Sequence, residues 1–109
     1  MDAADFDALV AEALDGIPEE FARYLDGVSV VVEDEPDEEG LYGLYQGVPL
    51  SERGHDFSAL PDRISIYRGP LLRDFHSRAA LRREVRLTIL HEIAHFFGLD
   101  ERRIRRLGY

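Results

Sequence analysis

The stretch that decides the fold of this chain is Leu90–Glu101, LHEIAHFFGLDE. It completes a run of apolar residues at helical spacing, which would share one face of a helix: Leu81, Val85, Ile89, Ile93 and Phe96. We therefore predict a long helix from about Arg78 to Phe97. Gly98 is expected to end it, because glycine adopts the left-handed backbone conformation at a helix end without strain.

Two histidines in this stretch form a candidate metal site. His91 and His95 are four residues apart, so both imidazoles would lie on one helix face, where they can hold a single ion. Glu92 follows the first histidine and would lie beside the ion, where a carboxylate can accept a proton from water. The pattern predicts a site for one Zn²⁺ with Glu92 as the general base.

The third ligand has to come from the acidic pair after Gly98. Only 14 residues follow His95 and none is histidine, which excludes a glutamate from a distant downstream helix. Glu101 lies six residues after His95, where the metzincin pattern His-Glu-x-x-His-x-x-Gly-x-x-His has its third histidine. A carboxylate can ligate zinc as an imidazole does. We predict Glu101, with Asp100 as the alternative, because a turn absorbs one residue of slack.

Helical periodicity is also present at the start of the chain. Apolar residues recur at helical spacing from Phe6 to Ile17, with Asp2 or Asp5 as a candidate cap and Gly16 and Pro18 as the end. A further short helical segment is expected after Pro18, and another over Glu101–Leu107.

Three short segments are predicted to be strands. Val28–Glu33 is rich in β-branched residues, Arg63–Arg68 alternates apolar and polar residues, and part of Leu41–Leu50 is expected to be extended. Asp34–Gly40 and Ser51–Asp62 are expected to be loops. The element order indicates a single α+β domain over residues 1–109, with a small sheet packed on the N-terminal helix and the long C-terminal helix.

Composition narrows the chemistry. Cysteine and lysine are both absent, which excludes disulfides, thiolate ligands and cysteine nucleophiles, and also Schiff-base chemistry. No apolar run approaches the roughly 20 residues that span a membrane, and the acidic N-terminus lacks the features of a secretory signal. We expect a cytoplasmic protein with no membrane partner.

Charge is divided unevenly along the sequence. Residues 1–40 carry 14 acidic side chains and one arginine, whereas residues 41–109 carry 12 arginines and 8 acidic side chains. We interpret the two halves as faces that attract each other in the folded chain. The net charge of −9 argues against a nucleic-acid partner.

The segment His91–Glu101, followed by RRIRRLGY, resembles the C-terminal end of the small bacterial zincin-like metallopeptidases, which end in His-Glu-x-x-His-x-x-Gly-x-x-Asp and a short Leu-Gly-aromatic tail. The resemblance covers nearly the whole chain. The similarity extends to VVVEDEP (Val30–Pro36), LYQGVPLS (Leu44–Ser51) and LPDRISIYRGP (Leu60–Pro70). It implies a minimal zincin fold, peptidase activity and one catalytic zinc on His91 and His95. The aspartate of the family falls on Glu101, which is a departure from the family pattern.

Other residues are candidates for contacts with substrate or with the developing oxyanion. Tyr67 and Arg68 are the preferred candidates, and His55, His76 and Tyr109 are others. Phe57 or Tyr67 could form a floor beneath the zinc, because the only methionine is Met1. Arg63–Arg68 is expected to be an edge strand that binds an extended peptide through its main chain.

Three functions remain in view. The first is a zinc-dependent peptidase acting on peptides or proteins. The second is a catalytically weak or inactive zincin-like module that binds a protein partner, which the small size of the chain favours. A zinc hydrolase acting on nucleic acid or a small amide ranks last, because the related RNA-processing hydrolases carry a third histidine that this chain lacks.

Overall fold

The computed structural model describes residues 1–47 and 62–109. The strands in these residues form one three-stranded sheet. Strands β1 (Val28–Glu33) and β3 (Asp62–Tyr67) are parallel, and β2 (Gly43–Gln46) pairs antiparallel with the other side of β3. The strand order is β1-β3-β2. β2 is therefore an edge strand and β3 is the central one.

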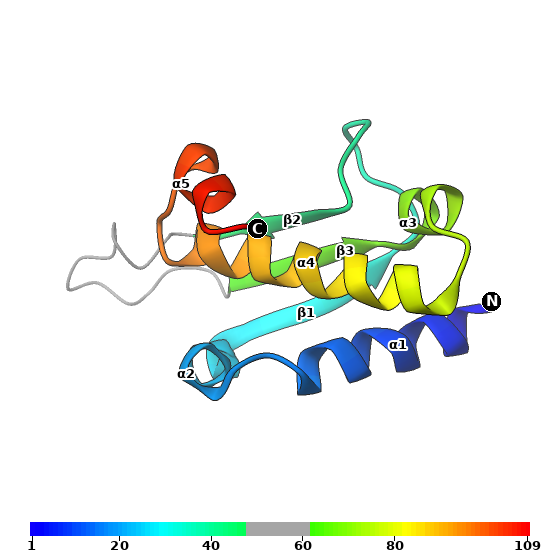
Figure 1. Ribbon diagram of the computed structural model, residues 1–109, viewed down its shortest axis with the longest axis horizontal. Helices are drawn as coiled ribbons and strands as arrows, with labels where there is room; N and C mark the ends of the chain where they lie inside the picture. The colour runs from blue at the N-terminus through cyan, green and yellow to red at the C-terminus, as the bar shows by residue number, and fades with distance from the viewer. Residues whose placement is uncertain (48–61) are drawn as a thin grey trace.

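Two helices cover one face of this sheet (Figure 1). α1 (Ala3–Asp15) packs against α4 (Arg78–Phe96), and α4 contacts β2 and β3. α1 begins at Asp2, whose carboxylate accepts a hydrogen bond from the main-chain N–H of Asp5 at 2.8 Å. The side chain of Ser77 caps α4 in the same way, so both helices start at residues that satisfy otherwise unpaired N–H groups.

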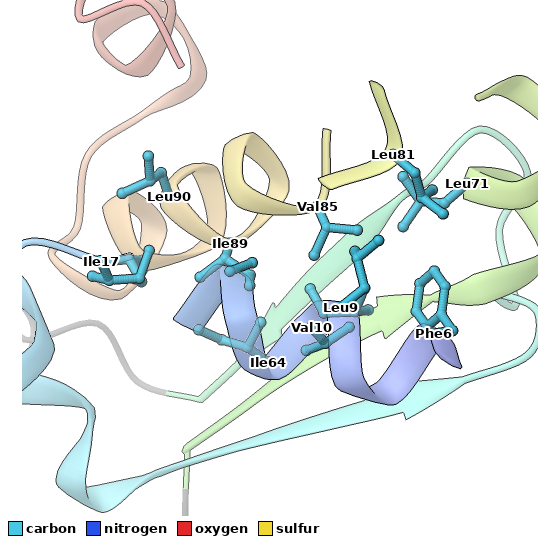
Figure 2. Close-up of a cluster of buried hydrophobic side chains, with 13 residues drawn as sticks. Phe6, Leu9, Val10, Ile17, Ile64, Leu71, Leu81, Val85, Ile89 and Leu90 are labelled. Carbon is cyan, nitrogen blue, oxygen red and sulfur yellow. The ribbon is translucent and has the colours of Figure 1, made fainter. Parts of the chain in front are cut away.

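The hydrophobic core lies between the sheet and these helices (Figure 2). Ile64 and Ile66 alternate along β3 and are fully buried, as expected for the covered face of a strand. They meet the apolar stripes of α1 and α4, whose fully buried members are Phe6, Leu9, Val85 and Ile89. The stripe of α4 fixes the rotation of the helix and leaves His91 and His95 partly exposed.

The connecting elements are short. α2 (Glu19–Ala22) and the 3₁₀ helix η1 (Arg23–Gly27) lead from α1 to β1. α5 (Glu101–Arg106) follows α4 and is held by Ile104, which is fully buried. The predicted α+β class is confirmed. Among the described residues, none of the helices is long and apolar enough to cross a membrane.

Three expectations about the β3 region are wrong. Asp62 belongs to the strand and not to the preceding loop, and the sequence RISIYR does not form an edge. Arg68 instead begins α3 (Arg68–Asp74), a helix that was not predicted because it contains Gly69 and Pro70. Pro70 is tolerated because it lies in the first turn, where its missing N–H has no helical acceptor. Residues 48–61 of the predicted segments Leu41–Leu50 and Ser51–Asp62 lie outside the described ranges.

Glycine is required at position 69 by a close approach of the chain. Its N–H donates a hydrogen bond to the main-chain oxygen of Asp34 at 2.8 Å. A Cβ atom at this position would lie 2.7 Å from the same oxygen. Gly69 therefore packs the start of α3 against the loop that follows β1, and it does not end the ordered structure.

Candidate metal centre

The last two turns of α4 bring the two histidines together. The imidazole rings of His91 and His95 have centroids 5.1 Å apart. One possible ligand atom from each of His91, Glu92 and His95 lies within 4.8 Å of the other two. The i, i+4 spacing thus produces the convergence that a single ion requires.

Gly98 turns the chain so that α5 returns to these imidazoles. Its φ of +87° is left-handed. Its N–H bonds to the oxygen of His95, and the N–H of Leu99 bonds to the oxygen of Ala94, which is the Schellman pattern of a helix end. As a result, one carboxylate oxygen of Glu101 lies 3.0 Å from His91 Nε2 and 2.7 Å from His95 Nε2.

Asp100, the acidic residue next to Glu101, caps a helix. One carboxylate oxygen of Asp100 accepts the main-chain N–H of Arg103 at 2.9 Å and caps α5. Asp100 lines the same hollow as the histidines, but the hydrogen bond ties its carboxylate to the start of α5. Of the two acids, Glu101 is the one that contacts both imidazoles.

Glu92 is buried beside the edge strand, with 7% of its surface exposed. Its Oε1 accepts a hydrogen bond from the main-chain N–H of Tyr45 at 2.8 Å. This contact needs β2 to lie close to α4, and Gly43 allows that approach. A Cβ at Gly43 would lie 2.6 Å from Cγ2 of Thr88 and 3.4 Å from Cγ of Glu92.

A hollow of about 550 Å³ opens over the imidazoles and Glu92. β2 and the residues flanking it form one wall, and the end of α4 with the start of α5 forms the other: Leu41, Gly43, Leu44, Tyr45 and Gly47 face Gly98, Leu99, Asp100 and Glu101. A second hollow of about 500 Å³ shares His91, Glu92 and Glu101 and continues toward Arg105 and Tyr109. The histidines therefore lie along a groove beside an edge strand.

Comparisons with known proteins identify the family of the chain. The sequence pattern of the zincin-like metallopeptidases matches residues 25–109. The chain belongs to this family. A solved structure, titled a conserved hypothetical protein from Thermo thermophilus, is similar with a TM-score of 0.60 and 31% sequence identity, covering 89% of this chain and 94% of that one. The comparison with curated proteins found no match.

Zinc fits the donor set of this zincin-like site. Two imidazole nitrogens and one carboxylate are a combination found in catalytic zinc sites, which leave a fourth position open. The chain offers that combination in the convergence of both Nε2 atoms on Glu101.

The pKa values of the two carboxyl groups at the zincin-like site, those of Glu92 and Glu101, are shifted in opposite directions. Burial raises the pKa of Glu92, although the nearby imidazoles and the Tyr45 N–H act in the opposite direction. Hydrogen bonds from His91 and His95 lower the pKa of Glu101, against a smaller opposing effect of burial. Burial opposes the charged form of His91, but its bonds to Tyr109 and Glu101 outweigh that effect and raise its pKa. The anionic form of Glu101 is thus favoured, whereas the protonated form of Glu92 is favoured more than in an ordinary carboxyl group.

Of the other predicted contact residues, Tyr109 lies against His91 and lines the second hollow, whereas Tyr67, Arg68 and His76 have partners elsewhere. Tyr67 lines a separate hollow with Glu33 and Arg63, and Arg68 pairs with Asp34. The ring of His76 bonds to the main-chain oxygen of Arg73. None of Tyr67, Arg68 and His76 lines the two hollows over the histidines, so their positions do not support a contact with substrate there. His55 and Phe57 lie outside the described residues.

The sequence reasoning missed three contributions to the zincin-like site. The N–H of Tyr45 and the main-chain oxygen of Tyr109, which is 3.1 Å from His91 Nδ1, are backbone groups that every residue carries. Gly43 did leave a signal, because a glycine within a strand often marks a close approach of another element.

Proposed function

We propose that this protein is a zinc-dependent peptidase. The observation that carries the proposal is the convergence of His91 Nε2 and His95 Nε2 on one oxygen of Glu101, next to the buried carboxylate of Glu92. In this proposal His91, His95 and Glu101 hold one zinc ion. When bound there, zinc would polarise a water molecule and the carbonyl of the scissile bond.

Glu92 is proposed as the general base and then the general acid. Its Oε1 is held by the Tyr45 N–H, and its environment raises its pKa. A carboxylate with a raised pKa accepts a proton from the attacking water more readily than an ordinary carboxylate does, and that proton is then passed to the leaving amine. Burial also keeps bulk water from competing for that proton.

The substrate is proposed to lie along β2 in an extended conformation. The main-chain oxygen of Tyr42 accepts the N–H of Tyr67 on β3. Because main-chain groups alternate sides along a strand, those of Gly43 point away from β3, toward the groove, and the Tyr45 N–H on the same side already binds Glu92. A peptide added there would gain main-chain hydrogen bonds that do not depend on its side chains. This assigns to β2 the role that the sequence suggested for Arg63–Arg68.

The proposal is tested with zinc-loaded protein and a peptide library. Glu92→Gln should lower turnover by about 10²–10⁴-fold, with zinc content unchanged, because the amide oxygen can still accept the Tyr45 N–H. Glu20→Gln is the control, since Glu20 is exposed on α2 and lines neither of the two hollows over the histidines. It should retain wild-type turnover.

The other possible outcomes would each contradict a different part of this proposal. Full activity in Glu92→Gln would contradict the mechanism. A wild type that binds one zinc per chain but cleaves no peptide would favour the alternative, a zincin-like module that binds a protein partner. A wild type that takes up no zinc would contradict the metal centre itself.

A further inference from the structure

The last residues of the sequence return to the metal centre. The main-chain oxygen of Tyr109 lies 3.1 Å from Nδ1 of His91, while Nε2 of the same ring faces Glu101. Figure 1 shows the C-terminal end beside α4 after the chain has passed through α5. Both nitrogens of the His91 ring therefore have a defined partner on the chain.

A second glycine turn delivers this oxygen. Gly108 has a φ of +93°. Its N–H bonds to the oxygen of Arg105, and the N–H of Tyr109 bonds to the oxygen of Ile104. This is the bonding pattern that Gly98 makes at the end of α4. The first turn brings Glu101 to Nε2 of His91, and the second brings Tyr109 to Nδ1.

The contact is made by the main chain of Tyr109, and its side chain is not part of it. The residue is 41% exposed. Its position comes from α5, whose Ile104 is fully buried and accepts the Tyr109 N–H. The buried Ile104 therefore fixes the position of the Tyr109 oxygen. The identity of the side chain at position 109 should matter little for the contact with His91.

We propose that Tyr109 is a positioning residue, whose main-chain oxygen holds the Nδ1–H of His91 and so presents the lone pair of Nε2 to the metal. A neutral imidazole carries one N–H, so an acceptor fixed at Nδ1 selects the form with Nε2 unprotonated. Partners of this kind orient a ligand histidine and raise its basicity. The inference rests on the proposed zinc site for its consequence, but the selection of the tautomer is a property of the chain alone.

The tautomer can be measured without metal. Glu101→Ala removes the carboxylate that competes for a proton on Nε2. In this variant at about pH 9, where an imidazole is neutral, ¹⁵N NMR should show His91 protonated at Nδ1. Deleting Gly108 and Tyr109 in the same background should shift His91 toward the Nε2–H form, which predominates in water. Tyr109→Ala keeps the main-chain oxygen and should leave the Nδ1–H form in place.

Zinc affinity supplies the second measurement, in protein that retains Glu101. By competition with a chelator, the deletion should weaken zinc binding about 10–100-fold, and Tyr109→Ala should bind as the wild type does. If the deleted chain does not fold, Gly108→Val takes its place. A Cβ at this position meets open space, but valine is strained at this φ, so the turn opens and the oxygen moves.

The outcomes separate this inference from the proposed function. Two results would overturn the positioning role. One is a His91 ring protonated at Nε2 in the Glu101→Ala variant that keeps Gly108 and Tyr109. The other is a Tyr109→Ala variant that behaves like the deletion. An Nδ1–H form that disappears with the tail, in a protein that takes up no zinc, would sustain the positioning role and reject the zinc peptidase.

Discussion

Asp100 and Glu101 are adjacent acids that the structure uses differently, so substitutions should separate their effects. Glu101→Ala removes the oxygen that contacts both Nε2 atoms. It should weaken zinc binding by more than the roughly 10–100-fold that loss of an outer hydrogen-bond partner costs. Asp100→Ala removes the cap of α5 and should lower the free energy of unfolding by about 1 kcal/mol. Chelator competition and urea unfolding measure the two effects.

Asp100→Asn is the control for this pair. Asparagine caps a helix about as well as aspartate, so the variant should keep both stability and zinc affinity. A loss of zinc in Asp100→Asn that equals the loss in Glu101→Ala would show that Asp100 is a ligand.

For single residues, the sequence predicts those members of the candidate site that act through their side chains. His91, Glu92 and His95 follow from helical spacing, and Glu101 follows from its distance past Gly98. The partners that orient them do not, because the Tyr45 N–H and the Tyr109 oxygen belong to the backbone. Tyr67 and Arg68 were proposed from chemical type alone, and strand register and ion pairing place them elsewhere.

The next scale is that of the elements, where the fit of β2 against α4 depends on Gly43. In Gly43→Ala the new Cβ would lie 2.6 Å from Cγ2 of Thr88 and 3.0 Å from the main-chain oxygen of Ser65. The strand must move away, which weakens the Tyr45–Glu92 hydrogen bond. We expect a loss of about 1–3 kcal/mol in the free energy of unfolding and lower peptidase activity. Urea unfolding and turnover measure these effects.

Two variants make the Gly43 prediction specific. Gly27→Ala meets no atom within 4 Å and should change stability little. Thr88→Ser removes Cγ2 but keeps the hydroxyl that bonds to Glu84, so it should partly restore Gly43→Ala. A double variant as unstable as the sum of its single variants would show that Thr88 is not the source of the strain.

The start of β2 is also tied to α3, and this contact is sensitive to alkali. The Tyr42 hydroxyl donates a hydrogen bond to Asp74, which raises the Tyr42 pKa to about 12. Because the folded-state pKa is raised, the stabilisation is complete below the ordinary value near 10 and is lost as pH rises toward 12. Alkaline absorbance titration should show a phenol, that of Tyr42, ionising near pH 12. That phenol should be absent in Tyr42→Phe and should ionise at lower pH in Asp74→Asn.

For the whole molecule, the sequence predicted the class but not the order of the strands. The apolar stripes of α1 and α4 specify a two-layer core, and their residues are buried in the core of the structure. Strand order depends on β3 lying between β1 and β2. Local pattern does not encode this position, because Arg63–Arg68 alternates whether it lies at an edge or in the centre. α3 was missed because Gly69 and Pro70 usually end structure, whereas here one packs against Asp34 and the other lies in a first turn.

The division of charge along the chain matches its folding. Four Arg–carboxylate ion pairs in the described residues each join the acidic N-terminal part to the arginine-rich remainder: Glu12–Arg78, Glu33–Arg63, Asp34–Arg68 and Glu35–Arg73. They support the interpretation that the two halves attract each other. Exposed pairs of this kind each contribute little to the free energy of unfolding.

The Glu12–Arg78 pair allows a test at this scale, because both charges oppose the helix dipoles. Glu12 is in the last turn of α1 and Arg78 is the first residue of α4. Exchanging them, Glu12→Arg with Arg78→Glu, keeps the ion pair and the net charge while placing each charge at the favourable helix end. The double variant should be about 0.5–1.5 kcal/mol more stable than the wild type in urea unfolding. Each single variant sets two like charges together and should be less stable than the double variant. A double variant less stable than the wild type would show that this contact depends on the packing of the two side chains and not on their charges.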